Sequence, residues 1–323
     1  ANSILVSLLD LCLFNIKKDM IDRIKNRSKS TVELFAPAKV NLFLAVTGKR
    51  EDGYHDLCTV LAKVSVGDTL EMKRTDKSEG VNLRCPGFED LETSGNLISQ
   101  AVDKWFQQSG ESWGVEITLK KKIPPMSGLG GGSSDAVSAL LGMNELGDES
   151  LAEDMLYNLA SEIGSDCPSF LTAGLCLAEG RGEHVRSIIE SLSQQISGQR
   201  VLLFRPDIGF STADVYARLA SKKTYSAKKR AQEVVKSWEN GNLPVEELLH
   251  NDLEIPVFEK HRYFLPLFEQ IKQQYGIQPR LSGSGSCCFA LLPSGFDQIS
   301  QLKDLILKAW GDKVFLQICE IID

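Results

Sequence analysis

The chain has 323 residues, of which 42% are hydrophobic, and 36 basic against 43 acidic side chains give a formal net charge of −7. The length indicates two domains, and the apolar content is enough for real cores, which excludes a disordered chain or a stapled mini-protein. A chain with this acidic balance and no dense Lys/Arg run lacks the basic surface of a nucleic-acid-binding protein. We therefore predict a soluble globular protein with no nucleic-acid partner.

The eight cysteines and four histidines do not form a metal-binding pattern. No CxxC pair occurs, and the histidines do not complete a zinc motif, so free thiols in a reducing compartment fit best and no protein metal ligand is predicted. The most hydrophobic stretch, residues 4–16, is interrupted by Asp10. It is also shorter than the roughly 20 apolar residues that a membrane span needs. We expect no membrane partner.

Residues 1–32 are predicted to be an N-terminal extension of unknown role. An apolar run precedes a basic one from Lys17 to Lys29, whereas a secretory signal carries its positive charge first and a transit peptide is richer in arginine and poorer in acid. The remaining alternatives are an amphipathic extension and a stretch that precedes a true start at Met20. We expect a cytoplasmic protein, with the plastid as the alternative if the extension is the remnant of a transit peptide.

The first predicted elements combine strands and helices. Residues 31–46 are rich in β-branched and aromatic side chains, which predicts two strand pieces joined at a bend at Pro37. Residues 96–108 carry apolar side chains on one helical stripe, so Trp105 and Phe106 are expected in the core rather than at a cofactor. Next come a strand, a glycine-rich loop and two helices, over residues 115–121, 122–135, 136–146 and 152–163.

The second half also interleaves both kinds of element. Strands are predicted at 174–178, 201–204 and 314–322, helices at 226–238 and 261–274, and a strand–GSGS–strand unit at 280–292. A charged, polar stretch near residues 186–200 predicts the domain boundary, with an N-terminal domain over 33–196 and a C-terminal domain over 197–323. The regular βαβ rhythm of a doubly wound sheet is missing, so the pattern favours an α+β fold.

The most informative segment is GLGGGSSDA at Gly128–Ala136, between a predicted strand and a helix. Consecutive glycines let the backbone approach a ligand and direct N–H groups inward, while the helix adds the positive end of its dipole. Ser133 and Ser134 add hydroxyls that can bind phosphate oxygens, and Asp135 falls in the first helical turn. Lys121, a few residues before the glycines, could reach a nucleotide bound to this loop. The segment is neither a GxxxxGK[ST] loop nor a Rossmann GxGxxG, so we predict a different phosphate-binding loop, with an ordinary glycine turn as the alternative.

Two charged residues in unusual settings suggest a catalytic pair. Lys39 lies in the otherwise apolar strand PAKVNLFL, where a lysine either extends to an edge or pairs with a carboxylate. Asp166, in GSDCPSF, would by itself be interpreted as a turn residue. A buried Lys39–Asp166 pair would explain both positions, because phosphoryl transfer to an alcohol needs a carboxylate to take the hydroxyl proton and a cation nearby.

Three further motifs carry little information on their own. The segments SGSGS at 282–286 and GRGE at 180–183 indicate turns first, and so does the GYH segment that contains Tyr54 and His55. A tyrosine ring can stack on a nucleobase, which gives the last motif its interest.

Together these motifs resemble those of the GHMP kinases, whose second motif is the glycine loop at Pro124–Ser134 and whose third is similar to LSGSGSCCFAL. The resemblance runs from about Phe35 to the C-terminus. It implies two α+β domains with the active site in the cleft between them. The opening PAKVNLFLAVTGKREDGYHDL is similar to the branch of the family that phosphorylates a cytidine diphosphate-linked methylerythritol in the non-mevalonate isoprenoid pathway.

The resemblance also implies a role for each site residue. Asp166 would be the general base and Lys39 its partner. ATP, with Mg²⁺, would bind Lys121, Pro124, Gly128, Leu129, Gly130, Gly131, Gly132, Ser133 and Ser134. The small-molecule substrate would contact Asn41, Tyr54, His55, Thr212, Tyr216, Gly283, Ser284 and Gly285. Among these, His55 would hydrogen-bond the cytosine and the two tyrosines would enclose its ring.

Two other functions stay open at this point. One is another small-molecule kinase of the same family, of the homoserine or mevalonate type, which would have no use for a nucleobase pocket. The other is a non-catalytic ATP-binding protein, which would have no use for a base. The loop around Asp166 departs from the usual GADVPFF through Cys167 and Ser169, but no group that the reaction needs is lost. The oligomeric state is predicted as monomer or homodimer.

Overall fold

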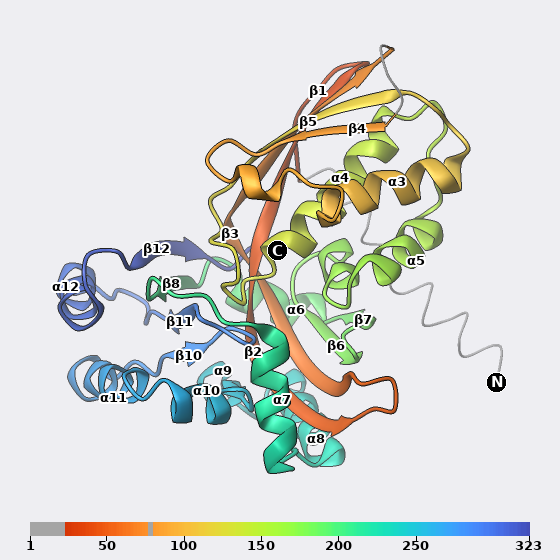
Figure 1. Cartoon of the computed structure of the whole chain (residues 1–323). Coiled ribbons are helices and arrows are strands. Elements are labelled where there is room, and N and C mark those ends of the chain that lie inside the picture. The colour runs from red at the N-terminus through yellow and green to blue at the C-terminus, as the bar shows by residue number, and fades with distance from the viewer. Residues whose placement is uncertain (1–22, 77–79) are drawn as a thin grey trace.

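Two β-sheets form the framework of the protein in this computed structural model, which describes residues 23–76 and 80–323 (Figure 1). The larger sheet contains β1 (Ile24–Arg27), β2 (Thr31–Lys49), β3 (His55–Thr75), β4 (Gly80–Arg84), β5 (Gly114–Lys120), β6 (Cys176–Gly180), β7 (His184–Ser187) and β9 (His250–Asn251). The smaller sheet has the order β10 (Arg280–Leu281), β11 (Cys288–Leu291), β8 (Arg200–Arg205) and β12 (Phe315–Glu320). The predicted α+β class is confirmed.

Strands β2 and β3 form a long antiparallel hairpin that runs through most of the molecule (Figure 1). The prediction of two strand pieces at Pro37 was wrong, because β2 continues through Pro37, where its register against β3 shifts as it does again at Asn41/Phe43 and Val46/Gly48. Proline has no N–H for the ladder, so a bulge at this point lets the strand continue. Opposite Pro37 lies Gly67, where a Cβ atom would come within 2.3 Å of the Ala36 carbonyl oxygen, so only glycine fits.

Three helices cover one face of the upper part of the larger sheet: α3 (Leu97–Ser109), α4 (Gly131–Leu146) and α5 (Glu153–Ile163). Trp105 is fully buried and Phe106 packs against the same core, which confirms that these aromatic side chains are structural. Helix α4 starts at Gly131, five residues earlier than predicted. The first N–H groups of a helix need no intrahelical acceptor, so glycines and serines are tolerated in its first turn once packing favours the helix.

The second core lies on the smaller sheet and is closed by helices from the C-terminal half. Its helices and those around it are α6 (Glu190–Ile196), α7 (Thr212–Lys222), α8 (Lys228–Glu239), α9 (Val245–Leu248), α10 (Glu254–Lys260), α11 (Phe264–Tyr275) and α12 (Ile299–Trp310). Two short 3₁₀ helices, η1 (Glu89–Leu91) and η2 (Cys167–Leu171), complete the described elements. None of the helices in the described ranges is long and apolar enough to cross a membrane.

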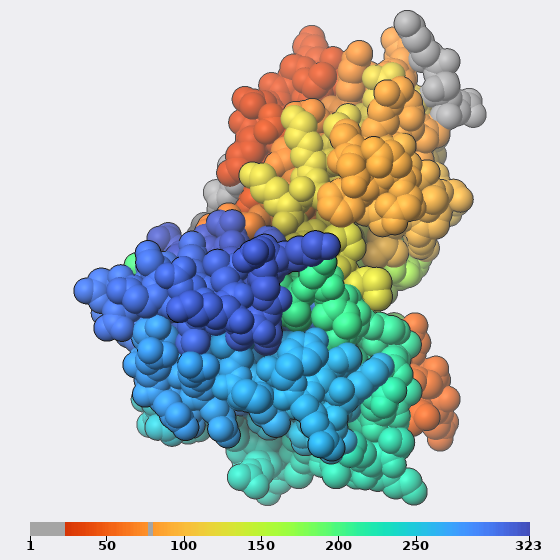
Figure 2. All heavy atoms as spheres, turned by 60° about the vertical axis from the view of Figure 1, so that its left-hand side comes forward, coloured from red at the N-terminus to blue at the C-terminus, as the bar shows by residue number. Residues whose placement is uncertain are grey.

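The two halves of the chain are joined through the long hairpin. Strand β9 pairs parallel with β2 at Phe43 and Leu44, and a bridge links Val64 to Ile321 near the C-terminus. Figure 2 shows the tip of the hairpin beside the helices of the second half. The predicted domain boundary between residues 196 and 197 falls between α6 and β8. It stays a prediction, because β9, which follows this boundary in the chain, pairs with β2 of the larger sheet. The predicted extension at residues 1–32 lies mostly outside the described residues.

Candidate active site

The glycine loop between β5 and α4 is packed so closely that side chains cannot replace two of its glycines, Gly128 and Gly130. At Gly128, with φ +77°, a Cβ atom would lie 2.1 Å from the Ser282 carbonyl oxygen. At Gly130, with φ +72°, it would lie 2.8 Å from the Phe170 ring and 3.0 Å from the Lys39 side chain. These contacts place the N-terminus of α4, with its free N–H groups, directly above Lys39, which is the geometry of an anion-binding site.

A second glycine-serine loop, residues 282–286, is hydrogen-bonded to the first one. The Cys287 N–H donates to the Ser127 carbonyl over 2.9 Å, and the Ser282 hydroxyl donates to the Gly128 carbonyl over 3.0 Å. Because one loop belongs to each half of the chain, these bonds fix the halves relative to each other at the site.

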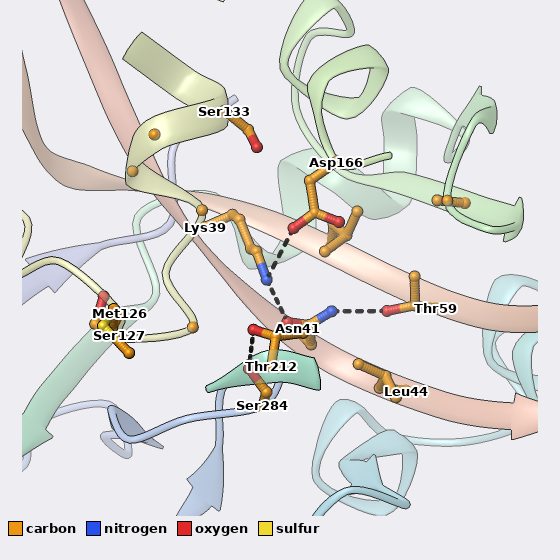
Figure 3. A pocket seen from close by; sticks show the side chains of 18 of the residues that line it. Lys39, Asn41, Leu44, Thr59, Met126, Ser127, Ser133, Asp166, Thr212 and Ser284 are labelled. Atoms are coloured by element: carbon orange, nitrogen blue, oxygen red, sulfur yellow. Dashed lines mark hydrogen bonds and ion pairs between the residues drawn. The ribbon is translucent and has the colours of Figure 1, made fainter. Parts of the chain in front are cut away.

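The predicted pair Lys39 and Asp166 comes together beneath the glycine loop (Figure 3). The Lys39 ammonium lies 3.7 Å from Asp166 Oδ2 and donates to Asn41 Oδ1 over 2.7 Å. Asn41 in turn donates to the Thr59 hydroxyl over 2.9 Å, which fixes its orientation. The Lys39 side chain is 5% exposed, but the Asp166 side chain is 44% exposed. Burial lowers the pKa of Lys39, and the charge of Asp166 opposes that effect.

Two cavities meet at Asp166. One, of about 290 Å³, is lined by Lys39, Lys121 and the glycine loop. The other, of about 450 Å³, is lined by Tyr54, His55 and Arg181. Both also contact Leu57, Asp166, Thr212 and Tyr216. The carboxylate at this junction therefore borders both cavities.

The second cavity has an aromatic wall. The rings of His55 and Tyr216 lie 5.0 Å apart at 33°, and burial lowers the pKa of His55, which favours its neutral form. His55 Nε2 is buried without a hydrogen-bond partner among the described residues. Tyr54 is 53% exposed, and the Arg181 guanidinium lies over its ring at 5.1 Å. Such a wall is suited to a flat, polar ring.

Most of the predicted site residues line one cavity or the other, but three do not. Leu129 is buried, and its carbonyl accepts the Lys39 N–H over 3.0 Å, so it fixes β2 at Lys39. Ser134 is fully buried, and its hydroxyl has no partner among the described residues. A Cβ atom on Gly285 would press against Leu281 and Phe210, so this glycine shapes the second loop. Thr212 and Ser284, which do line the first cavity, share a hydrogen bond of 2.8 Å.

Lys121 lines the cavity of the glycine loop, but its ammonium is not free. It lies 2.5 Å from Asp68 Oδ2 and 2.8 Å from Asp135 Oδ2, and all three side chains are at most 5% exposed. Burial raises the pKa of Asp135 to about 8 in spite of the nearby ammonium. The sequence placed Asp135 at the helix dipole, whereas the structure turns it toward Lys121.

Sequence reasoning missed several residues at the site. Asp68 and Thr59 lie in strands with no local motif, and only the pairing of β3 with its neighbours brings them here. Arg181 was interpreted as part of a turn, although a cation in GRGE near a predicted base pocket was a signal. Tyr225, whose ring lies 6.0 Å from that of His55, gave no signal.

No metal cluster of three or more His, Cys, Asp or Glu side chains occurs in the described ranges, and no disulfide joins the cysteines there.

The fold and the glycine loop define a GHMP kinase, and residues 96–174 match the family described as GHMP kinases N terminal domain. A solved homoserine kinase from Cytophaga hutchinsonii has this fold, with a TM-score of 0.71 at 18% identity over 92% of this chain and 96% of that one.

Two more similar proteins identify the branch. The 4-diphosphocytidyl-2-C-methyl-D-erythritol kinase of Carboxydothermus hydrogenoformans is 34% identical over 80% of this chain and 87% of its own length. A crystal structure of 4-(cytidine 5'-diphospho)-2C-methyl-D-erythritol kinase gives a TM-score of 0.69 at 30% identity, covering 89% of this chain and 99% of that one. The chain belongs to the 4-diphosphocytidyl-2-C-methyl-D-erythritol kinase family.

Proposed function

We propose that this kinase transfers the γ-phosphoryl group of ATP to the 2-hydroxyl of 4-diphosphocytidyl-2-C-methyl-D-erythritol, which yields the 2-phosphate and ADP. The reaction is a step of the non-mevalonate pathway to isoprenoid precursors. The observation that carries the proposal is the position of Asp166, because its half-exposed carboxylate borders both the cavity of the glycine loop and the cavity with the aromatic wall.

The transfer is a direct in-line displacement. Asp166 accepts the proton of the 2-hydroxyl as the oxygen forms its bond to the γ-phosphorus. The bond between that phosphorus and the bridging oxygen breaks, and ADP leaves with the electron pair. The Lys39 ammonium, held by Asn41 and close to Asp166, offsets the negative charge on the phosphoryl group in transit. No covalent enzyme intermediate is needed.

ATP binds along the glycine loop, where the N–H groups at the start of α4 and the hydroxyl of Ser133 border the cavity. Mg²⁺ enters with ATP as part of the substrate, bound to its phosphates. We assign no protein ligand to this ion.

The cytosine of the substrate binds the aromatic wall of the second cavity. Tyr54 and Tyr216 enclose its ring, and the unpartnered Nε2 of His55 forms a hydrogen bond to the polar edge of the base. Thr212, next to Ser284, lies near Asp166 and contacts the methylerythritol end.

The test is an ADP-release assay with Mg²⁺ and ATP. It compares 4-diphosphocytidyl-2-C-methyl-D-erythritol with mevalonate, homoserine and galactose at equal concentration. ADP release with the cytidyl alcohol alone is the expected result. ADP release with another alcohol would be consistent with Lys39 and Asp166 as the catalytic pair, but it would refute the assignment of the second cavity as a nucleobase pocket. If none of the four alcohols caused ADP release, the result would favour an ATP-binding protein without catalytic activity.

A variant of His55 tests the base pocket directly. His55→Phe keeps a ring against Tyr216 but removes Nε2, so one neutral hydrogen bond to the base is lost. We expect the KM for the cytidyl substrate to rise about 2–13-fold, as the loss of about 0.5–1.5 kcal/mol requires. The KM for ATP serves as the internal control and should not change. An unchanged KM for the cytidyl substrate would contradict the assignment.

We retain two further expectations as proposals. A cytoplasmic location is supported by the absence of disulfides among the described cysteines, since disulfides persist mainly in oxidising compartments. A monomer or homodimer is expected, and sedimentation of the purified chain would decide between them.

A further inference from the structure

A buried cluster of ionisable side chains lies beside the nucleotide cavity. The proposed reaction gives this cluster no role beyond contact of Lys121 with ATP. The Lys121 cluster consists of Lys121, Asp68 and Asp135, which come from the first residue after β5, from β3 and from α4. One ammonium and two carboxyl groups in a buried cluster are costly to maintain, because a buried charge loses its hydration. A cluster of this kind therefore calls for a function.

Asp68 is fixed by more than its contact with Lys121. Its Oδ1 accepts the backbone N–H groups of Lys122, over 2.5 Å, and of Ile123, over 2.8 Å, while its Oδ2 faces the ammonium. The carboxylate is completely buried. It thus holds both the side chain of Lys121 and the backbone that leads into the glycine loop.

Asp135 is held less firmly. Its Oδ2 accepts from Lys121, but its Oδ1 is buried without a hydrogen-bond partner among the described residues. It is placed by the second turn of α4, the same helix whose first turn borders the nucleotide cavity. Asp135 therefore ties the position of the ammonium to that of the phosphate-binding helix.

The ammonium itself points to the phosphate site. An ammonium group has three N–H donors, and the carboxylates take two of them. Lys121 Nζ lies 3.3 Å from the point that a Cβ atom on Gly131 would occupy, at the start of α4, and Lys121 lines the cavity. One donor remains for an oxygen of a phosphate bound at that helix terminus.

We propose that Asp68 and Asp135 are positioning residues that hold the Lys121 ammonium at the N-terminus of α4, ready to bind a phosphate of ATP. The inference rests on the proposed function, since it presumes that ATP occupies this cavity. An unrestrained lysine would lose rotamer freedom on binding ATP. In this cluster that ordering takes place during folding, so the affinity for ATP depends on residues that never touch it.

The test measures the affinity for MgATP without the acceptor, by calorimetry, together with KM for ATP and kcat. Lys121→Met should weaken ATP binding about 10–100-fold, the range for loss of a charged hydrogen bond. Asp135→Leu should weaken it several-fold and raise KM for ATP, with kcat at saturating ATP nearly unchanged. Asp135→Asn keeps an oxygen for the ammonium, so it should recover most of the affinity that Asp135→Leu loses.

The decisive comparison is a double-mutant cycle, which separates action through Lys121 from action by other means. In the Lys121→Met background, Asp135→Leu should have no further effect on the affinity for ATP. Asp68→Asn should likewise have no further effect on the affinity for ATP in the Lys121→Met background. The amide oxygen of this variant can accept the two backbone N–H groups only if its NH₂ group turns toward Lys121, so no oxygen is left for the ammonium.

The chain offers a matched control on the same two strands. Glu71 of β3 pairs with Lys120 of β5 on the exposed side, next to the buried pair. Glu71→Gln should leave the affinity for ATP unchanged.

The inference would be overturned if Asp135→Leu weakened ATP binding equally in the wild-type and the Lys121→Met backgrounds. It would also be overturned if Asp135→Asn did not recover the affinity that Asp135→Leu loses. If Asp68→Asn does not fold, the cycle of Asp135 with Lys121 decides alone. Failure of the wild-type protein to bind MgATP would instead refute the proposed function.

Discussion

Two lysine–carboxylate clusters border the same cavity, and they differ most in the exposure of their carboxylates. In the first, Lys39 is buried but Asp166 is 44% exposed, with 3.7 Å between the ammonium and Oδ2. In the second, Lys121 contacts Asp68 and Asp135 at 2.5 and 2.8 Å, and no side chain is more than 5% exposed. The first cluster is open and loose, whereas the second is closed and tight.

The difference teaches which cluster can take part in chemistry. A general base must reach the substrate and exchange its proton with solvent, so its carboxylate has to be accessible and cannot be committed to a short ion pair. Asp166 meets that condition, and Asp68 with Asp135 does not. A closed cluster can hold a cation in a fixed place, which suits binding rather than proton transfer. Under the proposed function, the same residue types therefore serve two purposes on either side of the glycine loop.

The largest expected effect comes from the loss of the exposed carboxylate of Asp166. Asp166→Asn keeps the shape of the side chain but cannot accept the hydroxyl proton, so kcat should fall about 10²–10⁴-fold. Binding of MgATP, measured by calorimetry, should survive, because the glycine loop is untouched. Turnover within a factor of a few of the wild-type value would refute the role of Asp166 as the base.

Removal of the cation from the open cluster should have a smaller effect. Lys39→Met loses the charge that offsets the growing charge on the phosphoryl group, and it leaves Asn41 without its donor. We expect kcat to fall about 10–100-fold, as for the loss of one charge-assisted hydrogen bond. Lys120→Met, at an exposed ion pair, is the control and should retain full activity. Equal activity of the two variants would show that Lys39 is only structural.

The open cluster could be predicted from the sequence, because each member lies in a conspicuous local setting. Lys39 interrupts an apolar strand, and Asp166 lies in a short loop after a helix, so chemistry alone suggested a partner for each. The elements around them were also predictable from hydrophobic periodicity, and most of their bounds fall within a few residues of the structure.

The closed cluster could not be predicted, because its members are unremarkable where they stand in the chain. Asp68 is one polar residue in a long strand, and Lys121 directly follows β5, whose single lysine, Lys120, is exposed. Only the pairing of β3 with β5 and the packing of α4 bring the three side chains together. The early start of α4 was missed for a related reason, since packing overrode the low helix propensity of its glycines.

The closed cluster also has a pH signature that the open one lacks. In the unfolded chain Asp135 loses its proton near pH 3.8, whereas burial raises its pKa in the folded protein to about 8. Its neighbours are Lys121, which stays charged, Asp68, and the Cys85 thiol, whose pKa burial raises to about 11. Between these two pKa values the folded state binds the extra proton, so stability falls as pH rises from about 4 to about 8.

Asp135→Asn removes this titration and sharpens the contrast. The melting temperature of the variant relative to the wild type should increase from pH 5 to pH 8, by a few degrees for each kcal/mol, and then stay constant. Asp148→Asn is the opposite control, because Arg74 lowers the pKa of this exposed carboxyl and the variant can only lose stability above pH 4. A difference for Asp135→Asn that is constant from pH 5 to pH 8 would mean that Asp135 is ionised in the fold, and that the cluster carries two full negative charges against one ammonium.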